Sequence, residues 1–189
     1  MSSRLERLGF DVTSTDASGA AVDVLRRRLA GEVQQANVTA LPFADSSFDG
    51  AVLGEVLEHV EEDRAALSEL RRVLRQGGVL ALSVPANPKL FGPSDEWAGH
   101  VRRYRRRDLL EACTEAGLTV NRCVAWGFPF SRLYHRHVYE RYLDRHGPAR
   151  PRGRHRPLVA AVGALLQLDR LFVGVERGAL GYLLLATRA

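Results

Sequence analysis

The strongest constraint on the fold is an alternation along the chain between short apolar runs, rich in β-forming residues, and segments with helical periodicity. The apolar runs are expected to be buried strands. Such runs lie at Phe48–Gly54 and Val79–Val84, and further strands are predicted at Phe10–Thr15, Val33–Asn37, Leu118–Trp126 and Gly181–Thr187. Strand–helix–strand repetition implies parallel pairing through right-handed crossovers. The pattern therefore predicts an α/β fold with a mostly parallel sheet and helices on both faces.

The clearest helix is predicted over Glu61–Arg75, where apolar residues recur at spacings of three and four. Acidic residues lie at its start and arginines at its end, as the helix dipole favours. Gly77 and Gly78 are expected to stop it. Further helices are expected at Ser3–Leu8, from a cap at Ser18 to a stop at Gly31, and at Asp108–Ala116, Ser131–Arg145 and Leu158–Phe172.

The length of 189 residues and the hydrophobic content of 46% suit one globular domain and exclude a disordered chain. Two cysteines cannot build a disulfide framework, and the uncharged stretch Pro157–Leu168 is too short to span a bilayer. We expect a single cytoplasmic domain over residues 1–189. Residues 86–107 and 127–157 are expected to form lids or inserts on the substrate side, and 158–189 the C-terminal helix and strand.

The charge is unevenly distributed, because residues 1–98 carry a net charge of −5 and residues 99–189 a net charge of +10. A cationic half can attract a nucleic acid, an anionic membrane or an anionic small molecule. Solvated helix faces in an arginine-rich protein explain the same composition. No RNA-binding motif accompanies the arginines, so a nucleic acid is not the expected partner.

Ligands of open α/β sheets bind beyond the carboxyl ends of the strands. Four positions meet that rule here: Asp16, Asn37, the pair Gly54 and Glu55, and the pair Pro85 and Ala86. A carboxylate such as Asp16 can bind ribose hydroxyls, and it can equally cap the following helix. Asn37 offers an amide to an adenine edge, and it is also an ordinary turn residue.

Several short strings occur in a characteristic order. They are Gly9–Ser18 (GFDVTSTDAS), Ala40–Phe43 (ALPF), Ser47–Asp49 (SFD), Glu55–Val60 (EVLEHV), Leu67–Leu70 (LSEL), Val73–Gly78 (VLRQGG) and Ser83–Pro85 (SVP). In this order the chain resembles the class I S-adenosylmethionine-dependent methyltransferases over roughly residues 4–126. The resemblance implies a Rossmann-like sheet, S-adenosylmethionine as cofactor and methyl transfer to a small-molecule acceptor.

The resemblance also implies roles for individual residues. Asp16, with Ala17 beside it, would bind the ribose hydroxyls, and Asn37 falls where the family more often has an aspartate contacting the adenine amino group. Val38 and Leu41 would flank the adenine ring, while Gly54 and Glu55 would border the methionine end.

One part of the family pattern is not found. The family's first strand and its glycine-rich turn should precede Arg4–Leu8, yet the chain begins at Met1. The expected fold therefore lacks its first strand, which would leave neighbouring strand edges uncovered and open to association with a second copy. A start upstream of Met1, a degenerate fragment and a partner that supplies the strand are the three explanations.

Methyl transfer requires alignment and water exclusion, and some acceptors also need a general base. His59 and His100 are the candidates, since histidine titrates near neutral pH. The alternative role for His59 is to fix its loop by hydrogen bonds. No His, Cys and carboxylate set with metal-ligand spacing is evident, so no metal site is predicted.

Substrate recognition is expected in the segment that follows the fourth predicted strand, where related methyltransferases show a similar Gly-His-x-Arg-Arg-Tyr string. The candidate residues are Trp97, His100, Arg102, Arg103 and Tyr104. The arginines can clamp a carboxylate or phosphate, or they can pair with acidic groups of the same domain. A non-catalytic, dimerising methyltransferase-like subunit and an RNA- or membrane-surface-binding protein are the competing functions.

Overall fold

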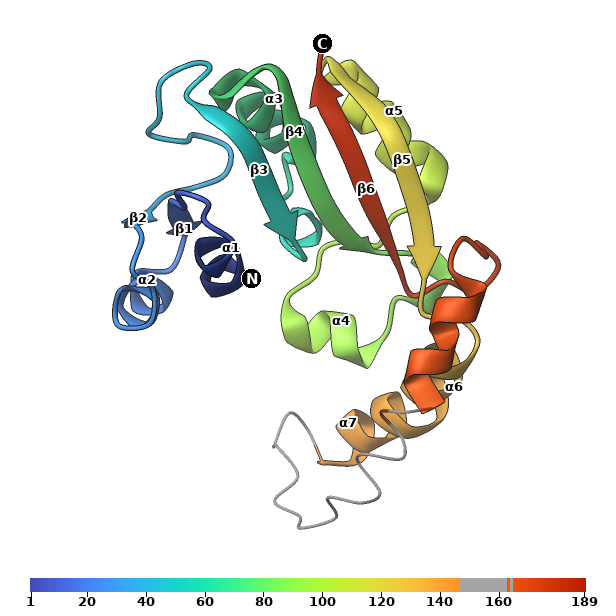
Figure 1. Ribbon diagram of the computed structural model, residues 1–189. Coiled ribbons are helices and arrows are strands. Elements are labelled where there is room, and N and C mark those ends of the chain that lie inside the picture. The colour runs from blue at the N-terminus through green and yellow to red at the C-terminus, as the bar shows by residue number, and fades with distance from the viewer. Residues whose placement is uncertain (147–162, 164) are drawn as a thin grey trace.

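The computed structural model describes residues 1–146, 163 and 165–189, and it has an α/β architecture (Figure 1). Its strands form a two-stranded sheet and a four-stranded sheet of order β3-β4-β6-β5. The strands are β1 (Ser14–Asp16), β2 (Val33–Gln35), β3 (Phe48–Gly54), β4 (Leu74–Pro85), β5 (Leu118–Trp126) and β6 (Gly181–Arg188). The bounds of β3 and β5 match the sequence prediction.

Strand pairing brings the carboxyl ends of neighbouring strands together. β1 is parallel to β2, with Asp16 opposite Gln35, and β3 is parallel to β4, with Gly54 opposite Ser83. β6 runs antiparallel to both β4 and β5. The sheet is therefore mixed, and the predicted fold class, α/β and Rossmann-like, is confirmed.

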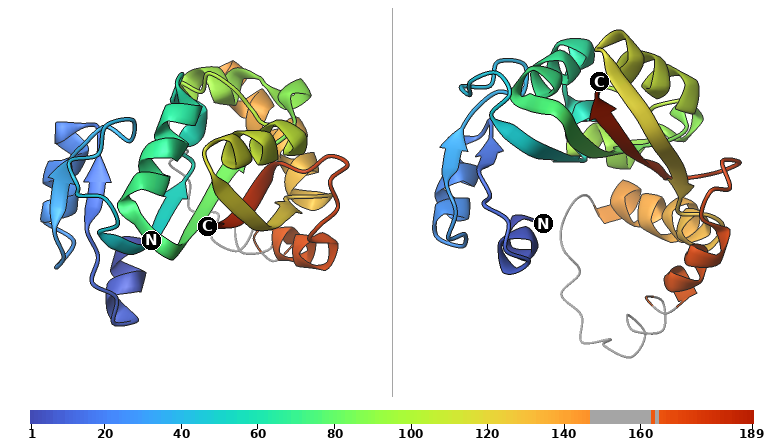
Figure 2. Two further views of the ribbon diagram at one scale, coloured as in Figure 1. Left: turned by 90° about the horizontal axis from the view of Figure 1, so that it is seen from above. Right: turned by 45° about the horizontal axis from the view of Figure 1, so that its top comes forward.

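The helices connect these strands. They are α1 (Ser2–Arg7), α2 (Gly19–Arg26), α3 (Asp63–Val73), α4 (Pro93–Ala98), α5 (Arg106–Glu115), α6 (Phe130–Tyr134) and α7 (Glu140–His146), with single turns η1 (Leu57–His59), η2 (Pro88–Leu90), η3 (His135–Tyr139) and η4 (Leu168–Phe172). Helices α3 and α5 pack against one face of the four-stranded sheet (Figures 1 and 2). Their leucines, including Leu67, Leu70 and Leu109, are buried with Leu80 and Leu184 of the sheet in the main core.

Several details differ from the sequence prediction: among the shorter elements, β1 begins at Ser14 and not at Phe10, and β2 ends at Gln35 and not at Asn37. Helix α3 ends at Val73, and Gly77 and Gly78 lie inside β4 instead of stopping the helix. A Cβ on Gly78 would lie 2.7 Å from the Arg75 carbonyl oxygen, so this irregular start of β4 needs glycine. Of the helix predicted over Leu158–Phe172, residues 158–162 and 164 lie outside the described part, 163 and 165–167 are α-helical as expected, and Leu168–Phe172 is a 3₁₀ turn.

The segment 86–107 carries two elements that the sequence did not predict, η2 and α4. Tyr104 closes the segment by pairing with Ala86 directly after β4. The segment 86–107 is therefore folded, and its two ends lie side by side at the end of β4.

Helix α1 lies between the two sheets (Figures 1 and 2). The Ser14 hydroxyl of β1 donates to the Ser2 hydroxyl at 2.9 Å, and the Met1 side chain lies against Gly54 at the end of β3. Within the described residues, β1 is paired only with β2, and β3 only with β4. The facing edges of β1 and β3 are thus unpaired there, as expected.

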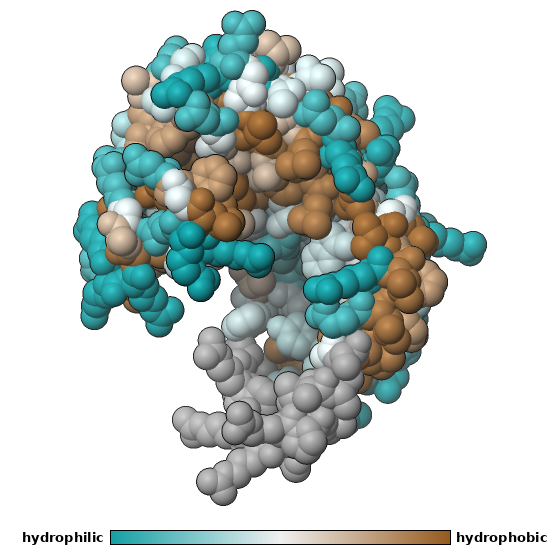
Figure 3. Space-filling view, viewed as in Figure 1, coloured by the Kyte–Doolittle hydropathy of each residue, from teal (hydrophilic) through white to brown (hydrophobic). Residues whose placement is uncertain are grey.

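The sheet face opposite α3 and α5 carries exposed apolar side chains, among them Val52, Leu183 and Leu185. Figure 3, which looks onto this face, shows apolar side chains over the middle of the sheet. Among the described residues, no helix is long and apolar enough to cross a membrane.

Candidate functional site

A sharp turn follows β3 and determines which side chains face inward. Glu55 adopts a left-handed backbone conformation with φ of 52°, which is unusual for a residue with a side chain. Its amide donates to the Ser83 carbonyl of β4 at 3.1 Å. The single turn η1 then places Glu58 in the interior and leaves His59 exposed. Strained backbone of this kind clusters at functional sites.

Glu58 is an unusual buried carboxylate. Its side chain is 0% exposed, and neither carboxylate oxygen has a hydrogen-bond partner among the described residues. Burial, with smaller contributions from the nearby carboxylates of Glu55 and Asp95, raises the pKa of Glu58 from 4.5 to about 7. An unsatisfied buried polar group is rare in folded proteins and indicates a functional role.

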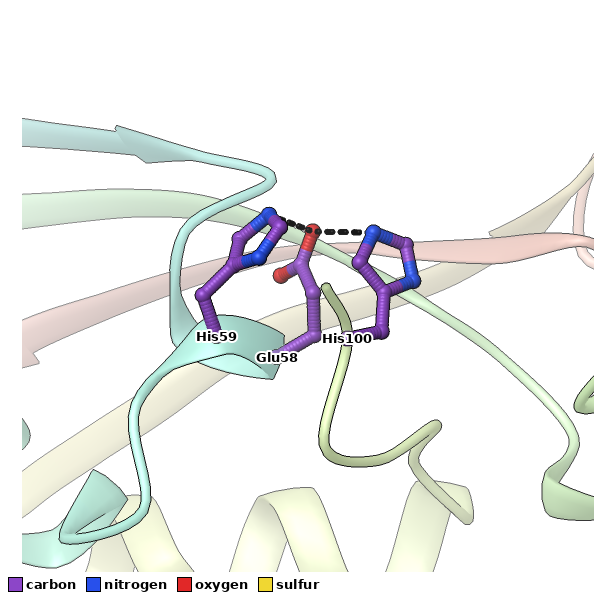
Figure 4. Close-up of side chains that lie close together, drawn as sticks. All are labelled: Glu58, His59 and His100. Carbon is purple, nitrogen blue, oxygen red and sulfur yellow. Dashed lines mark ion pairs between the residues drawn. The ribbon is translucent and has the colours of Figure 1, made fainter. Parts of the chain in front are cut away.

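Two histidines face Glu58 from separate segments (Figure 4). The Nε2 atoms of His59 and His100 lie 3.9 Å and 3.8 Å from Oε1 of Glu58. The two rings are 4.7 Å apart in an edge-to-face arrangement. The structure thus brings together both residues that the sequence analysis named as general-base candidates. The sequence analysis missed Glu58 in this cluster, because no spacing rule connects it with His100.

The loop that carries His100 is held against η1 by backbone contacts. The Val101 amide donates to the Glu58 carbonyl at 2.8 Å, and His59 Nδ1 lies 3.2 Å from the Gly99 carbonyl oxygen. His100 Nδ1 lies 2.7 Å from Oδ1 of Asp95, which is fully buried. Each Nδ1 therefore faces an oxygen acceptor, which favours a proton on that nitrogen and leaves Nε2 with a free lone pair.

The residues predicted to bind substrate make mostly internal contacts. Arg103 is 8% exposed, and its Nε donates to both carboxylate oxygens of Asp95 at 2.8 Å. Arg102 donates to Asp63 at 3.0 Å and to the Glu61 carbonyl at 2.8 Å. These contacts match the sequence-based alternative, pairing with acidic groups of the same domain, and give no support to an anion clamp.

Tyr104 and Trp97 belong to the same segment but differ in solvent exposure. The Tyr104 side chain is buried, and its hydroxyl donates to Asp63 at 2.9 Å. Trp97 is 57% exposed on α4, and so remains available to a ligand. Arg106, another arginine of the cationic half, also forms an ion pair within the domain, because its Nε lies 2.9 Å from Oε1 of Glu176.

The predicted cofactor residues lie at or after the strand ends. Asp16 ends β1, and its Oδ1 accepts from the Ser18 amide at 2.8 Å, while the neighbouring Ala17 is exposed. Asn37 is exposed, and its Oδ1 accepts from the Thr39 amide at 3.1 Å, so it forms a turn. Asn37 thus serves the turn role that the sequence left open, whereas Ser18 caps α2 and Asp16 forms a local turn just before it.

Val38 and Leu41 pack on the edge of the main core, and one arginine fixes their loop. Arg72 of α3 donates to the Leu41 and Phe43 carbonyls at 3.0 Å and 2.7 Å. It also binds Glu69, whose carboxylate accepts from the Leu41 amide at 2.9 Å. The sequence analysis considered Arg72 only as one of the arginines at the end of the predicted helix. It missed the hydrogen bonds by which Arg72 holds the loop of Leu41.

Part of the chain matches a known protein family. Residues 1–82 match the family described as a methyltransferase domain. The chain is 40% identical over 91 residues to a demethylmenaquinone methyltransferase of Clavibacter sepedonicus, a match that covers 46% of this chain and 37% of that protein. It is 52% identical over 56 residues to an O-methyltransferase of Aspergillus sclerotiorum, covering 29% of this chain and 21% of that one. The matches thus span less than half of each relative.

Solved structures show the same fold. A geranyl diphosphate C-methyltransferase of Streptomyces coelicolor, solved with S-adenosyl-L-homocysteine, superposes with a TM-score of 0.65 at 19% identity, over 99% of this chain and 68% of that one. The [4+2]-cyclase SpnF superposes with a TM-score of 0.61 at 22% identity, over 98% of this chain and 70% of that one. Residues 1–82 thus match the methyltransferase domain family, and the chain has the fold of the class I S-adenosylmethionine-dependent methyltransferases.

Proposed function

We propose that the chain transfers a methyl group from S-adenosylmethionine to a small-molecule acceptor. The observation that carries the proposal is the placement of Asp16, Asn37, Gly54 and Glu55 at or just after the carboxyl ends of β1, β2 and β3. Ligands of open α/β sheets bind at such ends. The family match over residues 1–82 and the methyltransferases among its relatives support the same reaction.

The side chains present fit an adenosyl group. Oδ1 of Asp16 accepts a hydrogen bond from the Ser18 amide. Oδ2 of Asp16 has no hydrogen-bond partner among the described residues, so this oxygen can accept from ribose hydroxyls. The exposed Asn37 amide can contact adenine N6, with Ala17, Val38 and Leu41 nearby along the two strand ends. Gly54 and Glu55 would border the methionine end.

The cofactor supplies an activated methyl group on a sulfonium. The residues of this chain would hold the acceptor in line with that methyl group, exclude water, and accept the proton that an oxygen or nitrogen nucleophile loses. His59 and His100 are the candidate bases, since their Nε2 atoms face Glu58. Trp97 is the exposed residue that we assign to the acceptor side, whereas Arg102, Arg103 and Tyr104 act by positioning this segment.

Methyl transfer is tested with S-adenosylmethionine carrying a labelled methyl group and a panel of small phenols, quinols, amines and acids. The proposal predicts labelled product and release of S-adenosyl-L-homocysteine with at least one acceptor class. His59→Ala should reduce the rate, whereas the exposed His137→Ala, remote in sequence on η3, should leave it unchanged. Absence of product with every acceptor, together with absence of cofactor binding, would contradict the proposal.

We also infer a cytoplasmic location, supported by the unpaired Cys113 and Cys123.

A second candidate function is association with a second copy of the chain. The unpaired edges of β1 and β3 and the exposed Leu183 and Leu185 of β6 favour it. Light scattering after size exclusion would detect a dimer, and Leu183→Lys with Leu185→Lys should dissociate it. A monomer at all concentrations removes this candidate.

A further inference from the structure

We propose that Glu58, His59 and His100 form a binding site for one divalent transition-metal ion. The inference goes beyond the proposed methyl transfer and does not depend on it, because metal binding is measured alone. With the ion bound, the two Nε2 atoms would be ligands and not proton acceptors. It begins from the two carboxylate oxygens of Glu58, which are fully buried and have no hydrogen-bond donor among the described residues.

The histidine nitrogens that face Glu58 make no hydrogen bond with it. Both histidines direct Nε2 toward Oε1 of Glu58, at 3.9 Å and 3.8 Å, beyond hydrogen-bond distance (Figure 4). Both use Nδ1 for another oxygen, that of Gly99 for His59 and that of Asp95 for His100. Three potential electron-pair donors that converge in this way can be held together by a cation.

The distances fit such an ion after a small adjustment. The three ligand atoms all lie within 4.8 Å of one another. Ligands at roughly 2.1 Å from a tetrahedral zinc ion are about 3.4 Å apart, so each pair must close by a few tenths of an ångström to somewhat over 1 Å. The exposed side chain of His59 can make most of that movement, because Glu58 and His100 are held more tightly.

The surrounding groups resemble the outer shell of known metal sites. Ligand histidines usually donate their second ring N–H to a carboxylate or a backbone carbonyl, which fixes the ring and raises the basicity of the ligand nitrogen. Asp95 does this for His100 and is itself held by Arg103 at 2.8 Å. The Gly99 carbonyl does this for His59.

The donor set indicates the class of ion. Two imidazoles and one carboxylate suit Zn²⁺, Fe²⁺ or Co²⁺, whereas Mg²⁺ and Ca²⁺ prefer oxygen ligands throughout. Three protein ligands leave at least one coordination position for water or for an oxygen of another molecule. His59 has a side chain that is 38% exposed, so the site opens to solvent on that side.

Cobalt titration of the untagged chain, after chelator treatment, tests the proposal. The visible absorption of Co²⁺ reports nitrogen and oxygen ligation directly. We expect one Co²⁺ per chain, displaced by Zn²⁺. Loss of an outer-shell partner alone typically weakens metal binding about 10-fold or more, so His59→Ala and His100→Ala should each weaken it by at least about 10-fold.

The exposed His137→Ala is the matched control and should bind Co²⁺ as the wild type does. Glu58→Gln keeps the size of the side chain and removes its charge, and it should lose binding while circular dichroism shows a folded chain. Because His59 is exposed, its variant remains informative even if the Glu58 and His100 variants do not fold. No uptake by the wild type, or uptake equal in the wild type and His59→Ala, would overturn the proposal.

Discussion

The Nδ1 atom of His100 lies 2.7 Å from Oδ1 of Asp95, and the same carboxylate also accepts from Arg103 on its buried side. Asp95 also accepts from the Gly92 amide at 2.9 Å. One fully buried carboxylate thus joins the start of α4, the loop of His100 and the chain that returns to β4. This contact links the stability of the segment 86–107 to the orientation of a histidine at the candidate site.

Arg103→Met should therefore destabilise the protein, because it leaves Asp95 buried without its cationic partner. Removing one member of a buried ion pair typically costs about 3–5 kcal/mol of unfolding free energy. Chemical denaturation measures the change. Arg107→Met is the control, because Arg107 is exposed and its replacement should change the unfolding free energy by less than about 0.5 kcal/mol. Equal stability of the two variants would contradict the role of the pair.

Tyr104→Phe should destabilise the protein by about 1–2 kcal/mol, since it removes a buried hydroxyl that donates to Asp63. Burial raises the pKa of Tyr104 well above its usual value, so the hydroxyl keeps its proton and its donor function throughout the accessible pH range. Thermal unfolding provides the measurement. The half-exposed Tyr134 offers a matched substitution to Phe, which should have a much smaller effect.

The contact between Glu69 and Arg72 should give the protein a specific sensitivity to acid. Hydrogen bonds from Arg72 lower the pKa of Glu69 below its ordinary value of 4.5. The ionised carboxylate is thus favoured in the folded state, and the contact stabilises the fold above pH 4.5 and is lost as the pH falls through the lowered pKa.

Glu69→Gln should accordingly lower the melting temperature at neutral pH and have little effect well below pH 4.5. Glu61→Gln is the control, since the Glu61 side chain is exposed. A Glu69→Gln effect of the same size at both pH values would show that the charge of Glu69 does not stabilise the loop of Leu41.

Much of the fold could be predicted because it depends on local patterns. β3 and β5 are apolar runs bounded by turn residues, and α3 has a regular apolar face. Helix α4 was missed because it has only six residues, half of them polar, and makes stabilising contacts through Asp95 and Glu140. The start of β4 was missed because a bulge opposite Phe48 extends the strand back to Leu74.

The candidate site was only partly predictable. His59 and His100 were chosen by residue type, but their proximity depends on the backbone contact between Val101 and Glu58, which joins segments 43 residues apart in sequence. The two roles of Arg102 and Arg103 could not be separated from sequence, because an arginine that clamps an anion and one that pairs internally look alike. The partners Asp63 and Asp95 become evident only in the fold.

Calorimetric titration of the chain with S-adenosylmethionine tests most directly whether the strand ends hold an adenosyl group. The account predicts saturable binding of one molecule per chain. Asp16→Ala should weaken it by about 10-fold or more, the size expected for a lost hydrogen bond to a charged group, and the exposed Asp11→Ala should not. No heat of binding at high concentrations of chain and cofactor, or equal affinity of the wild type and Asp16→Ala, would contradict it.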